Sequence, residues 1–226
     1  SVMGGEQAAM VLGMVGTFKN DKERAAYEAE IRAKYEAEGN PDHSTARLWE
    51  LTNTRYLLGL AGPFADILNQ QADPVRRSFR VHTAFTFDQT PAGNITARTN
   101  DAGPWALIEF AGALPRARLF TDWQVTTNDE TTLDILGNPS FDPHQVLLVN
   151  DSVAPPTAGN SNAAPGTVEF ASYAPKHIEL KATATAPSIL LLNDQFDRDW
   201  SVTVNGQPAR LLRCNYLMRG VQVPVG

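Results

Sequence analysis

Residues 188–225 constrain the fold of this chain more than any other stretch, because they form a close series of short β-strand patterns. Residues 189–192 are a continuous apolar run, which is typical of a strand buried on both faces. Residues 200–204 alternate large or apolar side chains with small polar ones, as a half-buried strand does. Asn205 and Gly206 follow, and this pair favours a type I′ turn, in which both residues need positive φ angles. The stretch therefore predicts a β-sheet module with a hairpin tip at Asn205-Gly206.

A second β-rich stretch begins at Phe79. Alternate residues there are large or apolar, which predicts a strand with one buried face. The residues expected on that face are Phe79, Val81, Thr83, Phe85 and Phe87. Further short strands are expected at residues 54–59, 95–99, 105–110, 145–150, 167–173 and 176–183.

Four segments have helical patterns. Residues 22–38 are rich in Ala, Glu, Lys and Arg, and Asn20 with Glu23 forms a capping box before the charged run. Shorter helices are expected at residues 44–51, 64–70 and 129–136, the last of them capped by Asn128.

These patterns predict an α+β, β-rich fold with a β-sandwich-like body, N-terminal helices and a small α/β insertion. Fifteen Pro and 16 Gly in 226 residues agree with a turn-rich chain. We expect two regions: residues 1–78 form a helical segment with one strand, and residues 79–226 form the sandwich-like domain. The α/β insertion is expected at about residues 113–150, where strand and helix patterns alternate.

Charge and motif content exclude several classes of function. The net charge of −6 leaves no basic stripe for phosphates, so no nucleic-acid partner is expected. The sequence has no glycine-rich phosphate loop and no nucleophile elbow, and its four histidines lack the spacing of a zinc site. Cys214 is alone on a strand pattern and is expected to be inert. The sequence therefore predicts no catalytic residue, metal or cofactor, although a glycosidase pair of carboxylates stays open, because its spacing is spatial.

An acidic cluster after the apolar run is the candidate ligand-binding site. Its members are Asn193, Asp194, Asp197 and Asp199. Such oxygens could hold calcium, but the cluster lacks the spacing of an EF-hand, and an acidic turn is ordinarily solvated. A sugar site would combine these groups with an exposed aromatic ring, for which Trp105 is the candidate. Trp123 and Trp200 occupy strand positions and are expected in the core.

The C-terminal stretch resembles the extracytoplasmic part of bacterial YfhO-type membrane proteins. In that family an apolar strand leads to an Asp, a Trp, a hairpin with V-x-V-[ND]-G, and a last strand with N-Y-x-x-R-x-V-x-V-P-x-G. The matching residues are Asp194, Trp200, Val202, Val204, Asn205, Gly206, Asn215, Tyr216, Arg219, Val221, Val223, Pro224 and Gly226. The family usually has Gly before the Trp, where this chain has Asp199. Further matches begin at Leu48 (LWELTNTRYLLG), at Leu114 (LPRA) and at Tyr173 (YAPKHIEL).

The resemblance implies a location, a partner and a function. YfhO-type proteins are multi-spanning and look like membrane-embedded glycosyltransferases that use lipid-phosphosugars. No apolar run here approaches the roughly 20 residues of a membrane helix, and no signal peptide is recognisable, so we expect an extracytoplasmic piece of a longer membrane protein. Its expected partners are the transmembrane part of the parent protein and a cell-envelope glycan acceptor, which it would position without catalysis. The alternatives are a purely structural or protein-interaction lid, and a self-sufficient carbohydrate-binding or glycosidase domain.

Overall fold

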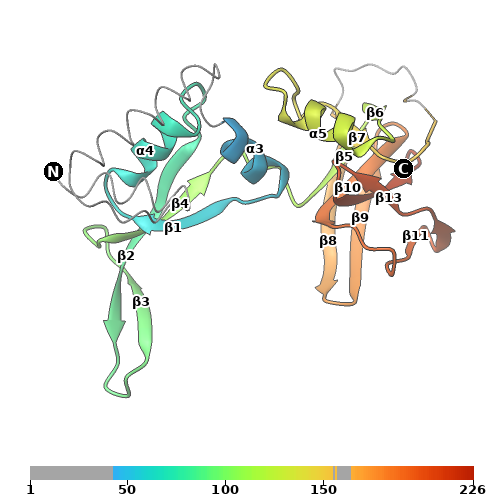
Figure 1. Ribbon diagram of the computed structural model, residues 1–226. Helices are drawn as coiled ribbons and strands as arrows, with labels where there is room; N and C mark the ends of the chain where they lie inside the picture. Colours follow the sequence, from blue (N-terminus) through green and yellow to red (C-terminus); the bar gives the residue numbers. More distant parts are fainter. Residues whose placement is uncertain (1–42, 155, 157–163) are drawn as a thin grey trace. The chain divides into compact units, whose positions relative to one another are not determined.

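The computed structural model describes residues 43–154, 156 and 164–226 (Figure 1). The helices in this part of the chain are α3 (His43–Leu51), α4 (Phe64–Gln71) and α5 (Asp129–Gly137). They confirm the three shorter helices predicted from the sequence. The side chain of Asn128 caps α5 by accepting a hydrogen bond from the backbone N–H of Thr131 at 2.9 Å. The helix predicted at residues 22–38 lies outside the described residues.

The first sheet is antiparallel, with its four strands in the order β1-β4-β2-β3. The strands are β1 (Tyr56–Leu60), β2 (Phe79–Gln89), β3 (Ile95–Thr99) and β4 (Trp105–Phe110). Helices α3 and α4 pack on one face. The ring of Trp49 in α3 lies edge-on to Phe79 and Phe110, and Asn69 in α4 exchanges two hydrogen bonds with the backbone of Phe79. Because side chains alternate along a strand, Trp105 lies on the opposite face to Phe110.

The sequence predicted that alternate side chains of β2 share one buried face, but the structure divides them between the two faces of the sheet. Phe79 is buried and stacks on Phe110 with the ring centroids 4.6 Å apart. Pairing with β4 then shifts register between Val81 and Thr83, and Phe87 is 46% exposed. The prediction of one buried face from Phe79 to Phe87 is wrong, because a shift of one residue moves the following side chains to the other face.

The second sheet has six strands in the order β5-β10-β14-β13-β7-β6. Its strands are β5 (Ala117–Phe120), β6 (Trp123–Val125), β7 (Leu147–Val149), β10 (Ser188–Gln195), β13 (Leu212–Cys214) and β14 (Met218–Val223). Strand β10 is paired on both sides, with β5 and β14, and its first six residues are buried. The central apolar strand is therefore confirmed. Cys214 is also buried, and burial raises the pKa of its thiol, which favours the inert form.

A small α/β unit belongs to this second sheet. Strand β6 pairs with β7 in parallel, and helix α5 connects them (Figure 1). Parallel neighbours need such a crossover connection. Buried Leu136 of α5 packs in one cluster with Leu148 of β7 and Leu51 of α3.

Two hairpins pack on the six-stranded sheet and make the body sandwich-like. They are β8 (Gly166–Ala174) with β9 (His177–Ala184), and β11 (Val202–Val204) with β12 (Gln207–Ala209). Apolar side chains of both hairpins cover Leu190 of β10 and Val221 of β14. In the β11–β12 turn, Asn205 has φ 51° and Gly206 has φ 75°, so the predicted hairpin tip is confirmed.

The α+β, β-rich fold class predicted from the sequence is thus confirmed. The described residues fall in one compact unit, Asp42–Gly226. The predicted division into residues 1–78 and 79–226, with an insertion at about 113–150, stays a prediction. None of the helices in the described part of the chain has the length and apolar character needed to cross a membrane.

Candidate functional site

The carboxylate of Asp194 is the centre of a polar cluster near the end of β10. Arg116 donates from Nε and Nη2 to its Oδ1 at 3.2 and 2.9 Å. Arg219 of β14 donates from Nη2 to Oδ2 at 2.9 Å, and the hydroxyl of Tyr173 on β8 donates to the same oxygen at 3.3 Å. Strands β8, β10 and β14 and the segment before β5 therefore meet at one carboxylate.

Each arginine of this cluster also lies over an aromatic ring. The Cζ atom of Arg116 is 4.2 Å from the ring centroid of Tyr173, and that of Arg219 is 4.1 Å from the ring of Trp200. Burial raises the pKa of Asp194, but hydrogen bonds and charges from the two arginines outweigh this effect and lower it overall. Asp194 is therefore an ionised carboxylate that holds both guanidinium groups in place.

Arg219 is the buried arginine of the pair. Its side chain is 7% exposed, whereas that of Arg116 is 45% exposed. The Nε and Nη1 atoms of Arg219 are shielded from solvent, and no group of the described residues accepts a hydrogen bond from them. Buried polar groups nearly always have a partner, and leaving one without costs about 1–3 kcal/mol. Arg219 therefore stands out as a candidate binding residue.

A hollow of about 700 Å³ opens beside Arg219. The turn between β8 and β9, the loop after β10, and strands β10 and β14 contribute to its walls. Leu190 and Val221 line its apolar part, and half-buried Trp200 lines it next to Arg219. The other charged or titratable residues in its walls are Lys176, His177, Asp197 and Asp199.

The structure separates the residues that the sequence grouped as a binding site. Asp197 and Asp199 are exposed and line the hollow, whereas Asp194 is engaged by two arginines. Asn193 is buried, and its side-chain amide donates to the carbonyl of Pro115 at 2.8 Å. Trp105 is half-buried on β4, in the other sheet.

The tryptophans predicted in the core and the arginine beside the hollow differ in how well the sequence indicated their positions. Trp123 is in the core, as predicted. Trp200, which was also expected there, is half-buried in the wall of the hollow. Arg219 was named in the sequence only as one of the residues that match the YfhO-type pattern, because a lone arginine among apolar residues does not indicate its partners.

The geometry gives no support for a cation in the acidic cluster. Within residues 43–154, 156 and 164–226, no three His, Cys, Asp or Glu side chains are arranged to hold a metal ion. Asp197 instead accepts a hydrogen bond from the backbone N–H of Asp199 at 2.9 Å, which organises the turn. The carboxylates of the hollow are thus available to hydrogen-bond donors from solvent or a ligand.

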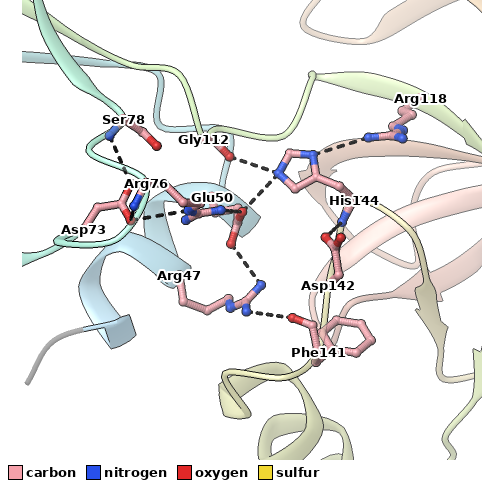
Figure 2. A network of polar contacts seen from close by, with 10 residues as sticks. All are labelled: Arg47, Glu50, Asp73, Arg76, Ser78, Gly112, Arg118, Phe141, Asp142 and His144. Atoms are coloured by element: carbon pink, nitrogen blue, oxygen red, sulfur yellow. Dashed lines mark hydrogen bonds and ion pairs between the residues drawn. The ribbon is translucent and has the colours of Figure 1, made fainter. Parts of the chain in front are cut away.

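A second polar network surrounds Glu50 (Figure 2). Glu50 is 1% exposed. Its carboxylate accepts hydrogen bonds from Arg47 and Arg76, each at 2.9 Å, and contacts Nε2 of His144 at 3.0 Å. Burial raises the pKa of Glu50, but the hydrogen bonds from His144 and Arg76 and the nearby positive charges outweigh it, so the pKa is lowered.

The groups around Glu50 are fixed in turn by neighbours (Figure 2). Arg47 donates to the carbonyl of Phe141 at 2.7 Å, and Arg76 donates to Asp73 at 3.3 Å. The Nδ1 atom of His144 lies 3.4 Å from Nη1 of Arg118. The network thus joins α3 to the segment before β2, to β5 and to the loop after α5. Since Glu50 is buried and fully engaged, its role is structural.

Comparisons with known proteins give a partial similarity to carboxylase beta subunits. No protein-family model matches the chain, and no solved structure gives a significant match. The beta1 subunit of biotin-dependent 3-methylcrotonyl-coenzyme A carboxylase from Mycobacterium tuberculosis is 49% identical over 74 residues, which cover 27% of this chain and 14% of that subunit. The probable mitochondrial methylcrotonoyl-CoA carboxylase beta chain of Drosophila melanogaster is 40% identical over 74 residues, covering 27% of this chain and 13% of that protein. The matches thus span about one seventh of these relatives, too little to show a family.

Proposed function

We propose that the compact unit Asp42–Gly226 is a non-catalytic carbohydrate-binding domain that positions a glycan acceptor. The observation that carries this proposal is the hollow beside β10 and β14, where Trp200 lies next to the carboxylates of Asp197 and Asp199. Protein sites for small molecules combine an apolar surface with a few polar groups that set orientation. This hollow has both.

The side chains of the hollow suit a sugar ring chemically. The exposed part of an indole ring packs against the C–H groups of a pyranose, and the ring is rigid, so little conformational entropy is lost on binding. The carboxylates of Asp197 and Asp199 can accept hydrogen bonds from sugar hydroxyls. Leu190 and Val221 provide an apolar floor from the sheet. The loop that carries Trp200 and both aspartates lies between β10 and β11, so one connection supplies all three side chains.

The resemblance to YfhO-type proteins supplies the setting for this proposal. In that setting the domain lies outside the cytoplasm as part of an integral membrane protein with glycosyltransferase character. Its partners are the transmembrane part of the parent protein and a cell-envelope glycan. The chemistry of sugar transfer then belongs to the parent, and the present domain contributes binding. The partial similarity to carboxylase beta subunits does not extend to an activity, because it covers about a seventh of their length.

NMR titration tests the proposal directly. Cell-envelope oligosaccharides are added to the ¹⁵N-labelled chain, and we expect shifts confined to residues around the hollow, with Kd on the order of millimolar. Trp200→Ala should abolish these shifts, while the matched variant Trp105→Ala, which changes a half-buried tryptophan of the other sheet, should preserve them. Circular dichroism checks the fold of both variants. Unchanged spectra at saturating glycan, or equal effects of the two variants, would refute carbohydrate binding at this hollow.

A specific observation favours a second candidate function, a protein-interaction domain. The face of the first sheet opposite α3 and α4 exposes apolar side chains, with Tyr56 45%, Leu58 62% and Phe87 46% accessible. Large apolar patches on a surface commonly mark contact sites for other proteins. Sedimentation velocity tests this alternative: concentration-dependent association that Leu58→Lys abolishes would support it. A monomer at all concentrations, together with glycan binding at the hollow, would favour the first proposal.

A further inference from the structure

We propose that the hollow binds an oxyanion of its glycan, a carboxylate or phosphate substituent, through the buried guanidinium of Arg219. This inference rests on the proposed carbohydrate-binding function and specifies its ligand class. It starts from the charges around Asp194. Arg116 and Arg219 together carry two positive charges, and both hydrogen-bond the single carboxylate of Asp194. The cluster of Asp194, Arg116 and Arg219 therefore carries one net positive charge.

Arg219 has hydrogen-bonding capacity that the described residues leave unused. Nη2 donates to Asp194, whereas Nε and Nη1 are buried and have no acceptor among the residues that the structure describes. Arg116 differs, since its Nε and Nη2 both donate to Asp194 and Nη2 also reaches the hydroxyl of Tyr173. A guanidinium is matched in geometry and charge to carboxylate and phosphate oxygens. Arg219 is thus the member of the pair equipped to bind an anion.

The side chain of Trp200 lies against Arg219 in the wall of the hollow. Arg219 and Trp200 both line the hollow, and the indole ring lies 4.1 Å from the guanidinium carbon. The ring attracts the positive charge of the guanidinium through its π electrons. Trp200 belongs to the short loop between β10 and β11, and its backbone N–H is bonded to the carbonyl of Asp197 at 3.2 Å. Because Nε and Nη1 are shielded from solvent, an oxyanion reaches them only when neighbouring side chains move, and Trp200 lies directly against the guanidinium. Binding therefore changes the environment of the indole.

The remaining charges of the hollow set its selectivity. Asp197 and Asp199 are exposed, so water and salt screen their repulsion of an anion. The opposite charge comes from Lys176, beside His177 in the turn between β8 and β9. The arrangement therefore favours a sugar that carries one oxyanion together with neutral hydroxyls, because the hydroxyls can donate to the two aspartates.

The test compares matched ligands on the whole chain. The probes are an oligogalacturonate, the same oligosaccharide with its carboxyl groups reduced to alcohols, glucose 6-phosphate and inorganic phosphate. We expect the oligogalacturonate to bind at least about tenfold more tightly than its reduced form, and glucose 6-phosphate to bind more tightly than inorganic phosphate. Tryptophan fluorescence should change at lower concentrations of the oligogalacturonate than of its reduced form. These probes also distinguish carboxylate from phosphate as the bound group, since a site specific for carboxylate would not bind glucose 6-phosphate.

Variants locate the effect at Arg219. Arg219→Gln should remove the preference for the anionic sugar, Arg219→Lys should retain part of it, and the control Arg116→Gln should retain most of it. If Arg219→Gln fails to fold, the side-chain Nε–H resonance of Arg219 in the unmodified chain gives the same information, because bound oxyanion must shift it. Equal binding of the acid and reduced oligosaccharides refutes this inference and leaves the proposed function intact. Binding of neither form refutes this inference, and if the cell-envelope oligosaccharides also cause no shifts, the proposed function is refuted as well.

Discussion

The buried carboxylate of Glu50 offers the sharpest test of what stabilises this fold. Glu50→Gln keeps the size of the side chain and removes its charge. The new amide has an NH₂ group, which is a hydrogen-bond donor and cannot accept. It would face donors from Arg47, Arg76 and His144, so some of these hydrogen bonds are lost. Breaking a buried ion pair by changing one partner costs about 3–5 kcal/mol. Since Arg76 is 46% and His144 29% exposed, water recovers part of this loss. We expect a cost of about 2–4 kcal/mol.

Urea and thermal unfolding at pH 7 measure this cost. For a unit of this size, each kcal/mol lowers the melting temperature by roughly 2–4 °C, so the variant should melt roughly 5–15 °C below the unmodified chain. The matched control is Glu109→Gln. Glu109 is also buried and bonded to two arginines, but Arg55 and Arg80 are 59% and 68% exposed and stay hydrated without it. Its effect should be clearly smaller, and equal effects of the two variants would refute the reasoning from partner exposure.

The pH dependence gives an independent check of the same argument. The pKa of Glu50 in the folded chain lies below its ordinary value of 4.5. Its contribution to stability is therefore complete above that ordinary value and is lost as the pH falls through the lowered pKa. The difference in unfolding free energy between the unmodified chain and Glu50→Gln should be constant near neutral pH and should shrink in acid. A difference that does not change down to pH 2 would show that the charge of Glu50 is not its source.

Three further predictions concern the second sheet. Leu191→Ala removes a side chain that is 1% exposed in the central strand and should lower the unfolding free energy by about 2–5 kcal/mol in urea titrations. Gly206→Ala adds a methyl group at φ 75° with no atom within 4 Å, so backbone strain alone should cost about 1 kcal/mol, measured in the same way. Asp194→Asn leaves Arg219 without its carboxylate and should lower the unfolding free energy by about 3 kcal/mol at pH 7. Because the pKa of Asp194 is lowered in the folded chain, this loss should vanish as the pH falls through that pKa. Unfolding curves at several pH values measure it.

Local sequence patterns predicted the elements of this fold well. The apolar run at residues 189–192 became a strand paired on both sides, and Asn205-Gly206 became a hairpin turn, because both depend on properties of adjacent residues. The exposed end of β2 was not predicted. The shift between Val81 and Thr83 depends on how β2 pairs with β4, and nothing in the alternation of β2 itself reveals it.

The candidate site was harder to predict than the fold. Asp197 and Asp199 line a hollow that the sequence did not predict, and the partners of Asp194 come from positions 116, 173 and 219. Contacts between residues so far apart in sequence follow from the pairing of strands, which composition does not encode. For the same reason, Trp105 appeared to be a companion of the acidic cluster although it belongs to a different sheet.

Glu50 and Asp194 each pair with two arginines, but we infer different roles for them. The difference lies in whether the remaining N–H groups of those arginines have acceptors within the fold. Around Glu50, Arg47 also reaches the carbonyl of Phe141 and Arg76 also reaches Asp73, so the surplus donors are bonded within the fold. Around Asp194, Arg219 keeps two buried N–H groups that nothing in the described residues accepts, and it lies against a hollow. A closed network of hydrogen bonds stabilises a structure and offers nothing to a ligand. An open one is less stable than it could be, and a ligand that supplies the absent acceptor recovers that stability as binding free energy. This difference is why we propose the Asp194 cluster, and not the network around Glu50, as the binding site.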